Sequence, residues 1–263
     1  MGRALQLITG TVNAAGAGYN TVTVSPGSSF AVAAGVSEGS IFLEQTWAKG
    51  ATTDQVQIFS PRMHDNNVGI RLQTGTSFSR RLLPWSVDQP LYQADTPTVQ
   101  THATGAGQSG IGVIYEYLDL PGAQGRFATW EDVDARIEQV YGQEVDVTSS
   151  AAIGTYGASV ALNAANDNFK ANRDYALLGY TVNAACLAVA ITGPDTSNYA
   201  VGGPGDPDPV WTFDFFKKAS METGRPFIPI IAANNRAATF VTAVDTAAST
   251  AVHVSLTLAL LKQ

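Results

Sequence analysis

Short stretches of alternating apolar and polar residues recur along most of the chain. The clearest cover residues 5–12, 41–47, 111–118 and 252–260, and turns rich in glycine, asparagine or proline separate them. A period of two places successive side chains on opposite faces of the backbone, so each stretch predicts a β-strand with one buried face. About seven or eight such strands fit into the first half of the chain, a spacing typical of β-sandwiches and barrels.

Two segments far apart in the sequence share a pattern that predicts an internal duplication. Residues 46–69 read TWAKGATTDQVQIFSPRMHDNNVG and residues 181–202 read TVNAACLAVAITGPDTSNYAVG. Aligning Pro61 with Pro194 also matches Val56 with Val189, Ile58 with Ile191, Val68 with Val201, and Gly69 with Gly202. A separation of about 130 residues is too long for a solenoid repeat and indicates a duplicated domain. Chance convergence of two β-rich halves is the alternative.

The shared pattern continues downstream and sets the expected fold. Residues 90–120 and 229–261 both run from a proline through an apolar run, a polar break and a small-residue turn to an alternating strand. We expect a mainly β protein, with two tandem antiparallel β-sandwich or jelly-roll domains and a few short helices. The first domain is expected over 1–125 and the second over 151–263, with a helical linker at 126–150.

That linker carries the signals of a helix. Thr129, with Asp132 three residues later, resembles a capping box, and acidic residues fill the first turn. Val133 and Val140 belong to one apolar stripe at helical spacing. The pattern predicts a helix from Thr129 to Tyr141.

A second helix is expected within the second domain. Asp208 can cap it with Pro209 at its first position, and it would run from Val210 to Gly224. The preceding residues 202–209, GGPGDPDP, contain three prolines and three glycines. Such a composition predicts a loop rather than a strand.

Composition and charge favour a protein that packs against other protein. Charged residues make up only 14% of the chain, against a norm of about 25%. The net charge is −7, and the densest basic spots are the pairs at 80–81 and 217–218. A protein that binds a nucleic-acid backbone over a large area needs a basic face. We therefore expect no direct binding to nucleic acid.

The ends of the chain and its single thiol point to synthesis inside a cell. Cys186 is the only cysteine, so no internal disulfide can form, and its apolar surroundings predict a buried small side chain. The N-terminus has no long apolar segment, so we expect no signal peptide. No apolar run approaches the roughly 20 residues that span a bilayer.

The search for catalytic or metal-binding residues finds no constellation. His64, His102 and His253 lack metal-ligand spacing. Asp206 and Asp208 could approach a calcium ion, but Asp-Pro pairs in a rigid turn explain them better. We therefore expect no metal, no cofactor and no enzymatic activity. One aromatic set could instead line a sugar-binding face: Trp85, Tyr92, Tyr115 and Tyr117.

Two similar β domains over residues 5–261, a neutral surface and no catalytic set resemble the double jelly-roll major capsid proteins of tailless icosahedral phages and related viruses. The likeness is one of plan, because no diagnostic motif can be quoted and the chain is short for the family. The resemblance implies a major capsid protein that self-assembles as trimers of pseudo-six-fold shape into an icosahedral shell, made in the host cytoplasm and residing in the virion. It also implies other virion proteins as partners and allows an internal membrane beneath the shell.

Loops and the helix inserted between strands are the expected assembly contacts. The candidate residues are Arg80, Arg81, Trp85, Asp206, Asp208, Trp211 and Phe215. A two-domain carbohydrate-binding or surface-attachment protein is the main alternative. A decoration or spike protein of the virion is another.

Overall fold

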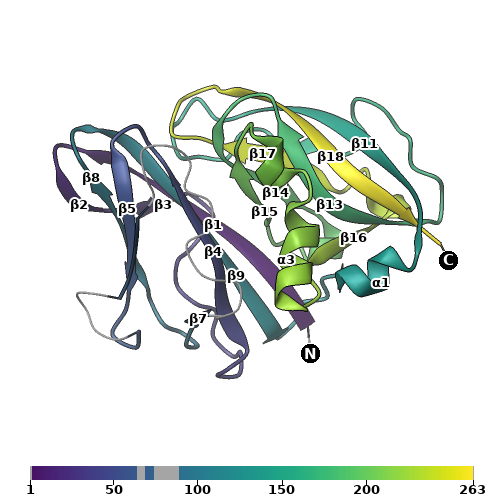
Figure 1. The fold of residues 1–263 in the computed structure, drawn as a ribbon, viewed down its shortest axis with the longest axis horizontal. Helices are drawn as coiled ribbons and strands as arrows, with labels where there is room; N and C mark the ends of the chain where they lie inside the picture. Colours follow the sequence, from purple (N-terminus) through teal and green to yellow (C-terminus); the bar gives the residue numbers. More distant parts are fainter. Residues whose placement is uncertain (1, 64–68, 74–88, 263) are drawn as a thin grey trace.

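The computed structural model describes residues 2–63, 69–73 and 89–262 (Figure 1). Its strands form four sheets, two built from residues 2–120 and two from residues 127–261. We call these the first half and the second half. In Figure 1 the two halves lie side by side along the long axis of the molecule. The fold is mainly β, as the alternating sequence pattern predicts.

The described residues of the first half form nine strands. They are β1 (Gly2–Ala14), β2 (Gly18–Thr21), β3 (Thr23–Val24), β4 (Ile41–Lys49), β5 (Thr53–Phe59), β6 (Ile70–Gln73), β7 (Gln89–Pro90), β8 (Thr98–Ala103) and β9 (Gly107–Leu120). One sheet has the order β3-β1-β9-β4-β7 and the other has the order β2-β8-β5-β6. Residues from both sheets, such as Ile41 and Val56, share one core, so the sheets form a sandwich.

The second half also contains nine strands. They are β10 (Phe127–Ala128), β11 (Ile137–Thr148), β12 (Val160–Ala161), β13 (Asp174–Val182), β14 (Cys186–Thr192), β15 (Val201–Gly205), β16 (Ile228–Ala232), β17 (Phe240–Val244) and β18 (Ala251–Leu261). Their sheets have the orders β10-β16-β13-β18-β11 and β12-β17-β14-β15. A core that includes Val189 and Leu258 fills the space between them.

The two halves repeat one topology. The order β1-β9-β4-β7 in the first half corresponds to β11-β18-β13-β16 in the second. The order β2-β8-β5-β6 corresponds to β12-β17-β14-β15. In each half, the first and the last of these eight strands pair with each other. The eight strands together have the order of a jelly roll. The duplicated pattern in the sequence therefore reflects a duplicated strand order.

Pairing registers agree down to single residues. Leu43 pairs with Tyr115 just before a β-bulge, and Leu177 pairs with Leu258 just before a bulge at the same place in β13. A bulge is an inserted residue that proteins use to bend a strand, so its recurrence marks the same construction in both halves.

The predicted alignment is correct before the proline and wrong after it. Ile58 pairs with Val99, and Ile191 pairs with Val241 at the corresponding place, as the alignment requires. Gly202, however, pairs with Ala190 inside β15, and its counterpart in β6 is Arg71 rather than Gly69. From the proline to the matched position in the next strand, the first half has two residues more than the second. Matching residues at equal distances from the proline therefore gives the wrong pairs. Val68 lies outside the described residues.

The predicted helix over Thr129 to Tyr141 is correct only in its first turn. Helix α1 covers Trp130–Asp134, and the Thr129 hydroxyl accepts a hydrogen bond from the Asp132 N–H as expected of a cap. From Ile137 the chain becomes β11, which pairs along its length with β18. Pairing with this long apolar strand outweighs a marginal helical pattern. The predicted helical linker at 126–150 is therefore mostly strand.

The predicted loop at 202–209 is also partly wrong, because β15 covers Val201–Gly205. This strand lies at the edge of its sheet and pairs only with β14, so Pro204 costs it no ladder bond on the open side. A Cβ on Gly202 would lie 2.0 Å from the Val189 carbonyl oxygen, so the close pairing needs glycine. Residues 30–36, although mostly apolar, form no strand.

The predicted second helix forms in two pieces. Helix α2 covers Pro209–Thr212 and α3 covers Phe215–Thr223, with Asp208 capping α2 and Gly224 ending α3 in a left-handed conformation. Together they form an insert between β15 and β16, which we call the α2–α3 insert. Phe215 and Phe216 fix it to the second half by packing on Tyr180. Among the described helices, none is long and apolar enough to cross a bilayer.

Candidate assembly surfaces

The two halves meet through one face of each. The outer face of β1, β9 and β4 packs against the outer face of β14 and β15. Leu7 from β1 lies beside Ala190 and Thr242, which line a small cavity of ≈390 Å³ with it. Leu5, Leu7 and Ile114 consequently belong to the core of the second half. The halves are thus joined by an apolar contact of the kind found inside a domain.

Trp47 is the anchor of this contact. Its side chain is fully buried, and its indole Nε1 donates a hydrogen bond of 2.8 Å to the carbonyl oxygen of Leu187 across the contact. Lys49, two residues further along β4, forms an ion pair with the buried carboxylate of Asp245 and donates to the Ala185 carbonyl oxygen at 3.0 Å. Large buried aromatics with one satisfied polar atom carry much of the free energy of interfaces.

A buried charge cluster lies at the other end of the same contact. Arg225, which follows α3, pairs with Glu44 at 2.8 Å and with Glu116 at 2.5 Å, and Arg3 also pairs with Glu116. The Arg225 guanidinium lies 4.7 Å from the centre of the Phe42 ring. The side chains of Glu44 and Glu116 are almost wholly buried. Buried carboxylates need such partners, so the α2–α3 insert is tied to the first half by its C-terminal arginine.

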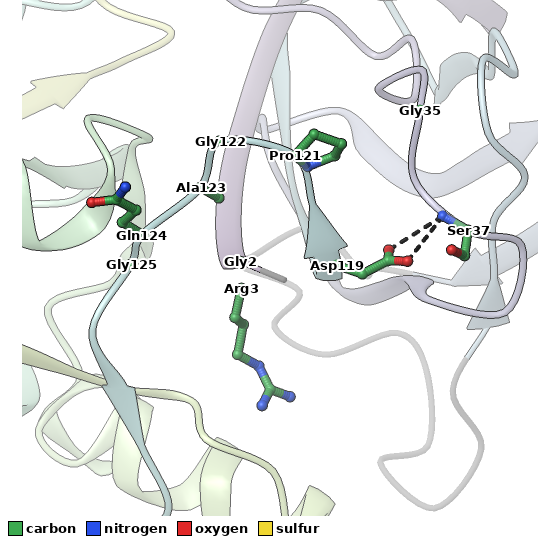
Figure 2. Close-up of a pocket in the computed structure, with 10 residues that line it drawn as sticks. All are labelled: Gly2, Arg3, Gly35, Ser37, Asp119, Pro121, Gly122, Ala123, Gln124 and Gly125. Atoms are coloured by element: carbon green, nitrogen blue, oxygen red, sulfur yellow. Dashed lines mark hydrogen bonds between the residues drawn. The ribbon is translucent and has the colours of Figure 1, made fainter.

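A shallow hollow of ≈830 Å³ lies where the chain passes from one half to the other. Figure 2 shows its lining, with Arg3 and Asp119 as its charged side chains. Asp119 accepts hydrogen bonds from the Ser37 N–H, and Arg3 is held by Glu116. The rest of the lining is mainly glycine, proline, alanine and backbone. The hollow therefore offers neither an acid–base pair nor an apolar pocket for a ligand.

The outside of the α2–α3 insert is apolar and exposed. The exposed side chains are Val210, Trp211, Phe213 and Met221, which are 43–63% exposed. Lys218 lies between them, because its Nζ donates to the Val210 carbonyl oxygen at 2.6 Å and it precedes Met221 by three residues on the helix. Clusters of several large exposed apolar side chains mark interaction surfaces in many proteins.

The same sheet face has opposite character in the two halves. In the first half the outer face of β1, β9 and β4 is buried. The side chains at the corresponding places in β11, β18 and β13 are exposed or half-buried. They are Val140 for Leu5, Gly142 for Leu7, Glu144 for Thr9, Asp146 for Thr11, His253 for Gly110, Ser255 for Gly112 and Thr181 for Trp47. We call Val140, Gly142, Glu144, Asp146, His253 and Ser255 the acidic face.

The other sheet also differs between the halves. Ala190 and Thr242 are buried in the contact between the halves. The corresponding residues of the first half are Gln57, which is 2% exposed, and Gln100, which is half-buried. Around them the outer face of β2, β8, β5 and β6 presents Tyr19, which is 40% exposed, with His102 edge-on at 5.0 Å and Arg71 above its ring at 5.3 Å. We call Tyr19, Gln55, Arg71, Gln100 and His102 the tyrosine face.

Buried nucleophiles and acids in the described part of the chain are held in unreactive states. Burial, followed by the nearby Asp245 charge, raises the pKa of the Cys186 thiol to about 12. Burial raises the pKa of Tyr117 to about 12. No group of three or more metal-ligating side chains occurs among the residues that the structure describes. Both groups act as packing, in keeping with the expected burial of Cys186.

The sequence-predicted contact residues fall into three groups. Arg80, Arg81 and Trp85 lie outside the described residues. Asp208 caps α2 and binds the indole N–H of Trp211, which is itself exposed.

The remaining two candidates are buried within the chain, and their role as assembly contacts stays a prediction. Phe215 is 6% exposed and packs on Tyr180 and Phe216. Asp206 is 5% exposed and accepts a hydrogen bond from the Asp208 N–H. The aromatic sugar-binding set fails similarly, because Tyr115 and Tyr117 lie in the core of the first half.

The residues that join the halves were not identified from the sequence. Two signals were present: Glu44 follows the apolar run 41–43, and Glu116 lies within the mainly apolar run 111–118. A buried carboxylate requires a cation, which would have directed attention to the few arginines of the chain.

Comparisons with known proteins give limited guidance. No family model matches the chain, and no curated protein does. Among solved structures, the chain is similar to the major capsid protein P2 of bacteriophage PM2, with 8% identity, a TM-score of 0.25, and coverage of 99% of this chain and 98% of that one. It is also similar to the PBSX exported protein XepA, with 13% identity, a TM-score of 0.20, and coverage of 98% and 86%. Both TM-scores are too low to establish a shared fold.

Proposed function

We propose that this chain is a structural protein of a virus particle, a major capsid protein that self-assembles as trimers of pseudo-six-fold shape into an icosahedral shell. The observation that carries the proposal is the repeated strand order, β1-β9-β4-β7 with β2-β8-β5-β6 and β11-β18-β13-β16 with β12-β17-β14-β15. One chain supplies two halves with the same strand order, and three chains supply six.

The contact between the two halves also supports a structural role. A fully buried tryptophan and a buried charge cluster fix the halves to one another. Two domains held in a fixed relative orientation can repeat the same geometry many times in a shell, whereas flexibly linked domains cannot. The small residues and neutral side chains of the surface allow close approach of identical copies without strong like-charge repulsion.

The test is the state of the purified protein. Size-exclusion chromatography with light scattering should give a mass three times that of the 27.6 kDa chain, and negative-stain microscopy should show hexagonal capsomers or closed shells. A monomer at every concentration, in both low and high salt, would overturn the proposal. A trimer that never forms shells would instead favour a decoration or spike protein.

A further inference from the structure

The edge of β11 is open, whereas the matching edge of β1 in the first half is covered. The Leu7 N–H donates to the Ala200 carbonyl oxygen, and the Thr9 carbonyl oxygen accepts from the Ser25 N–H, with 2.8 Å in both bonds. Strand β3 pairs with the same edge of β1 directly after these bonds. In the second half, β11 is the last strand of its sheet, and among the described strands it pairs with β18 alone.

The chain that could cover the edge of β11 is held elsewhere. In the first half, the chain leaves β8 after β2 and runs along β1 as β3. In the second half, β12 pairs with β17, and the Leu162 N–H extends this pairing by donating to the Thr239 carbonyl oxygen at 2.8 Å. The loop that follows accepts hydrogen bonds from the side chain of Gln143 rather than from the backbone of β11. The difference in path leaves the edge without its cover.

The repeated strand order shows which backbone groups face the open edge. In an antiparallel strand, every second residue directs both its N–H and its C=O to one side. In β1 these residues include Leu7 and Thr9, which form hydrogen bonds away from β9. Gly142 and Glu144 occupy the same places in β11, and Asp146 follows at the same spacing. Their N–H and C=O groups therefore point away from β18, where no described residue forms a hydrogen bond with them.

This edge is also long and exposed. Strand β11 has 12 residues, whereas the other edge strands of the described sheets have two to five. Gly142 is exposed, and because glycine has no side chain, this exposure is that of the backbone itself. In Figure 1, β11 lies beside β18 on the side of the second half that faces away from the first half. A long open edge is a template on which an additional strand can pair.

The charges beside the edge indicate what kind of strand fits it. The side chains of Glu144 and Asp146 are 58% and 79% exposed, and both approach His253. Among the described residues, no lysine or arginine pairs with either carboxylate, and one imidazole cannot offset two negative charges. Oppositely charged side chains on neighbouring strands stabilise their pairing, and like charges oppose it. The edge therefore suits a basic strand, whereas β11 of a second copy would add further carboxylates.

We propose that the open edge of β11 binds an extended segment of another protein that carries lysine or arginine at every second position. The backbone of that segment pairs with the N–H and C=O groups of Gly142, Glu144 and Asp146. Its basic side chains lie over the carboxylates of the acidic face. This inference goes beyond the proposed function, because a shell-forming role does not require such a partner.

Synthetic peptides test the two parts of this recognition separately. The probe is a fluorescently labelled peptide of about eight residues in which lysine and threonine alternate, titrated with the whole protein and followed by anisotropy. The first control has the same sequence with N-methyl groups at every second residue, so that it keeps the charge and loses the donors that pair with β11. The second control replaces lysine with glutamate. We expect binding of the probe, binding about tenfold weaker with N-methylation, and no binding of the glutamate peptide.

Variants of the protein locate the site. Gly142→Pro removes one outward N–H and should weaken binding of the probe about tenfold. Gly142→Ala is the matched control and should bind as the parent does, because its Cβ would lie 3.4 Å from the Ser255 hydroxyl oxygen and fits there. The variant E144K/D146K should bind the glutamate peptide in place of the lysine peptide. Circular dichroism of each variant shows whether the fold is kept.

Hydrogen exchange identifies what occupies the edge. With the lysine peptide bound, the amides of Gly142, Glu144 and Asp146 should exchange more slowly than in the free protein. Equal affinity for the N-methylated peptide would reduce the interaction to charge attraction and overturn the strand pairing. Protection only at other strands would overturn the site. Protection of these three amides that rises with protein concentration in the absence of peptide would assign the edge to a second copy and overturn the basic partner.

Discussion

The first and second halves share a strand order but differ in what they do with it. On the outer face of β4, Trp47 lies opposite Gly112, and at the same place on β13, Thr181 lies opposite Ser255. The first pair is buried beneath the second half and the second pair is partly open. One architecture therefore gives a permanent contact in one place and an accessible surface in the other.

The difference shows how a duplicated fold acquires separate roles. Backbone pairing and bulges are kept, because changing them would disturb the whole sandwich. Outward side chains can change freely, because they only decide what covers the sheet. Large and apolar residues fix the two halves to each other, while smaller or charged residues leave the corresponding face of the second half exposed.

The largest expected effect comes from removing the anchor of the contact. Trp47→Ala should lower the free energy of unfolding by about 3–5 kcal/mol, because it empties a fully buried site and leaves the Leu187 carbonyl oxygen unpaired. The matched change in the second half, Thr181→Ala, should cost at most about 0.5 kcal/mol. Urea denaturation measures both. Equal losses in the two variants would show that the halves do not differ as described.

Removing the central cation of the charge cluster should have an effect of similar size. Arg225→Met removes an ion-pair partner from the buried carboxylates of Glu44 and Glu116, at a cost of about 3–5 kcal/mol. Arg62→Met, which removes the exposed pair with Glu38, is the control and should cost less than about 1 kcal/mol. Thermal unfolding should give two separated transitions if Arg225 couples the halves. A single unshifted transition would contradict the coupling.

The strand content of both halves was predictable because alternation is a local signal. Strands such as 252–260 were placed within a residue or two, since each has one apolar face in the sequence itself. The caps at Thr129 and Asp208 were predictable for the same reason, because a cap is decided by neighbours within one turn.

The errors arose where a distant partner decides the structure. Residues 137–148 became a strand because β18 lies beside them, and Val201–Gly205 became a strand because an edge position tolerates Pro204. The contact between the halves joins Trp47 to Leu187, a separation of 140 residues, so no local pattern could reveal it. The burial of Phe215 could not be predicted either, because an apolar side chain on a helix gives the same sequence pattern whether it packs inward or outward.

A reciprocal exchange sharpens the comparison at one pair of positions. A Cβ at Gly112 would lie 2.2 Å from the Trp47 ring, so Gly112→Ser should cost about 1–3 kcal/mol through overpacking. Ser255→Gly, the converse change in the second half, should cost at most about 1 kcal/mol, from backbone entropy alone. Differential scanning calorimetry should rank them in this order. The opposite ranking would mean that Gly112 is not set by the contact.

The smallest effect concerns His253, which occupies the place of the buried Gly110. A hydrogen bond to Asp146, and then the charges of Asp146 and Glu144, raise its pKa above the ordinary value of 6.5. A raised pKa means that the protonated pair stabilises the fold below the unfolded pKa, and that this contribution is lost as the pH rises through the folded pKa. NMR titration should show a lower pKa for His253 in Asp146→Asn.

The matched variant for this titration is Glu144→Gln, which should lower the pKa of His253 by less, because Glu144 lies 3.7 Å from Nε2 and contributes after Asp146. Melting temperatures should agree with the sign. Asp146→Asn should be slightly less stable than its parent in mild acid, and the gap should close in mild alkali, where the imidazole is neutral in both states. A difference in melting temperature that widens with rising pH would show that Asp146 stabilises the fold through a group other than His253.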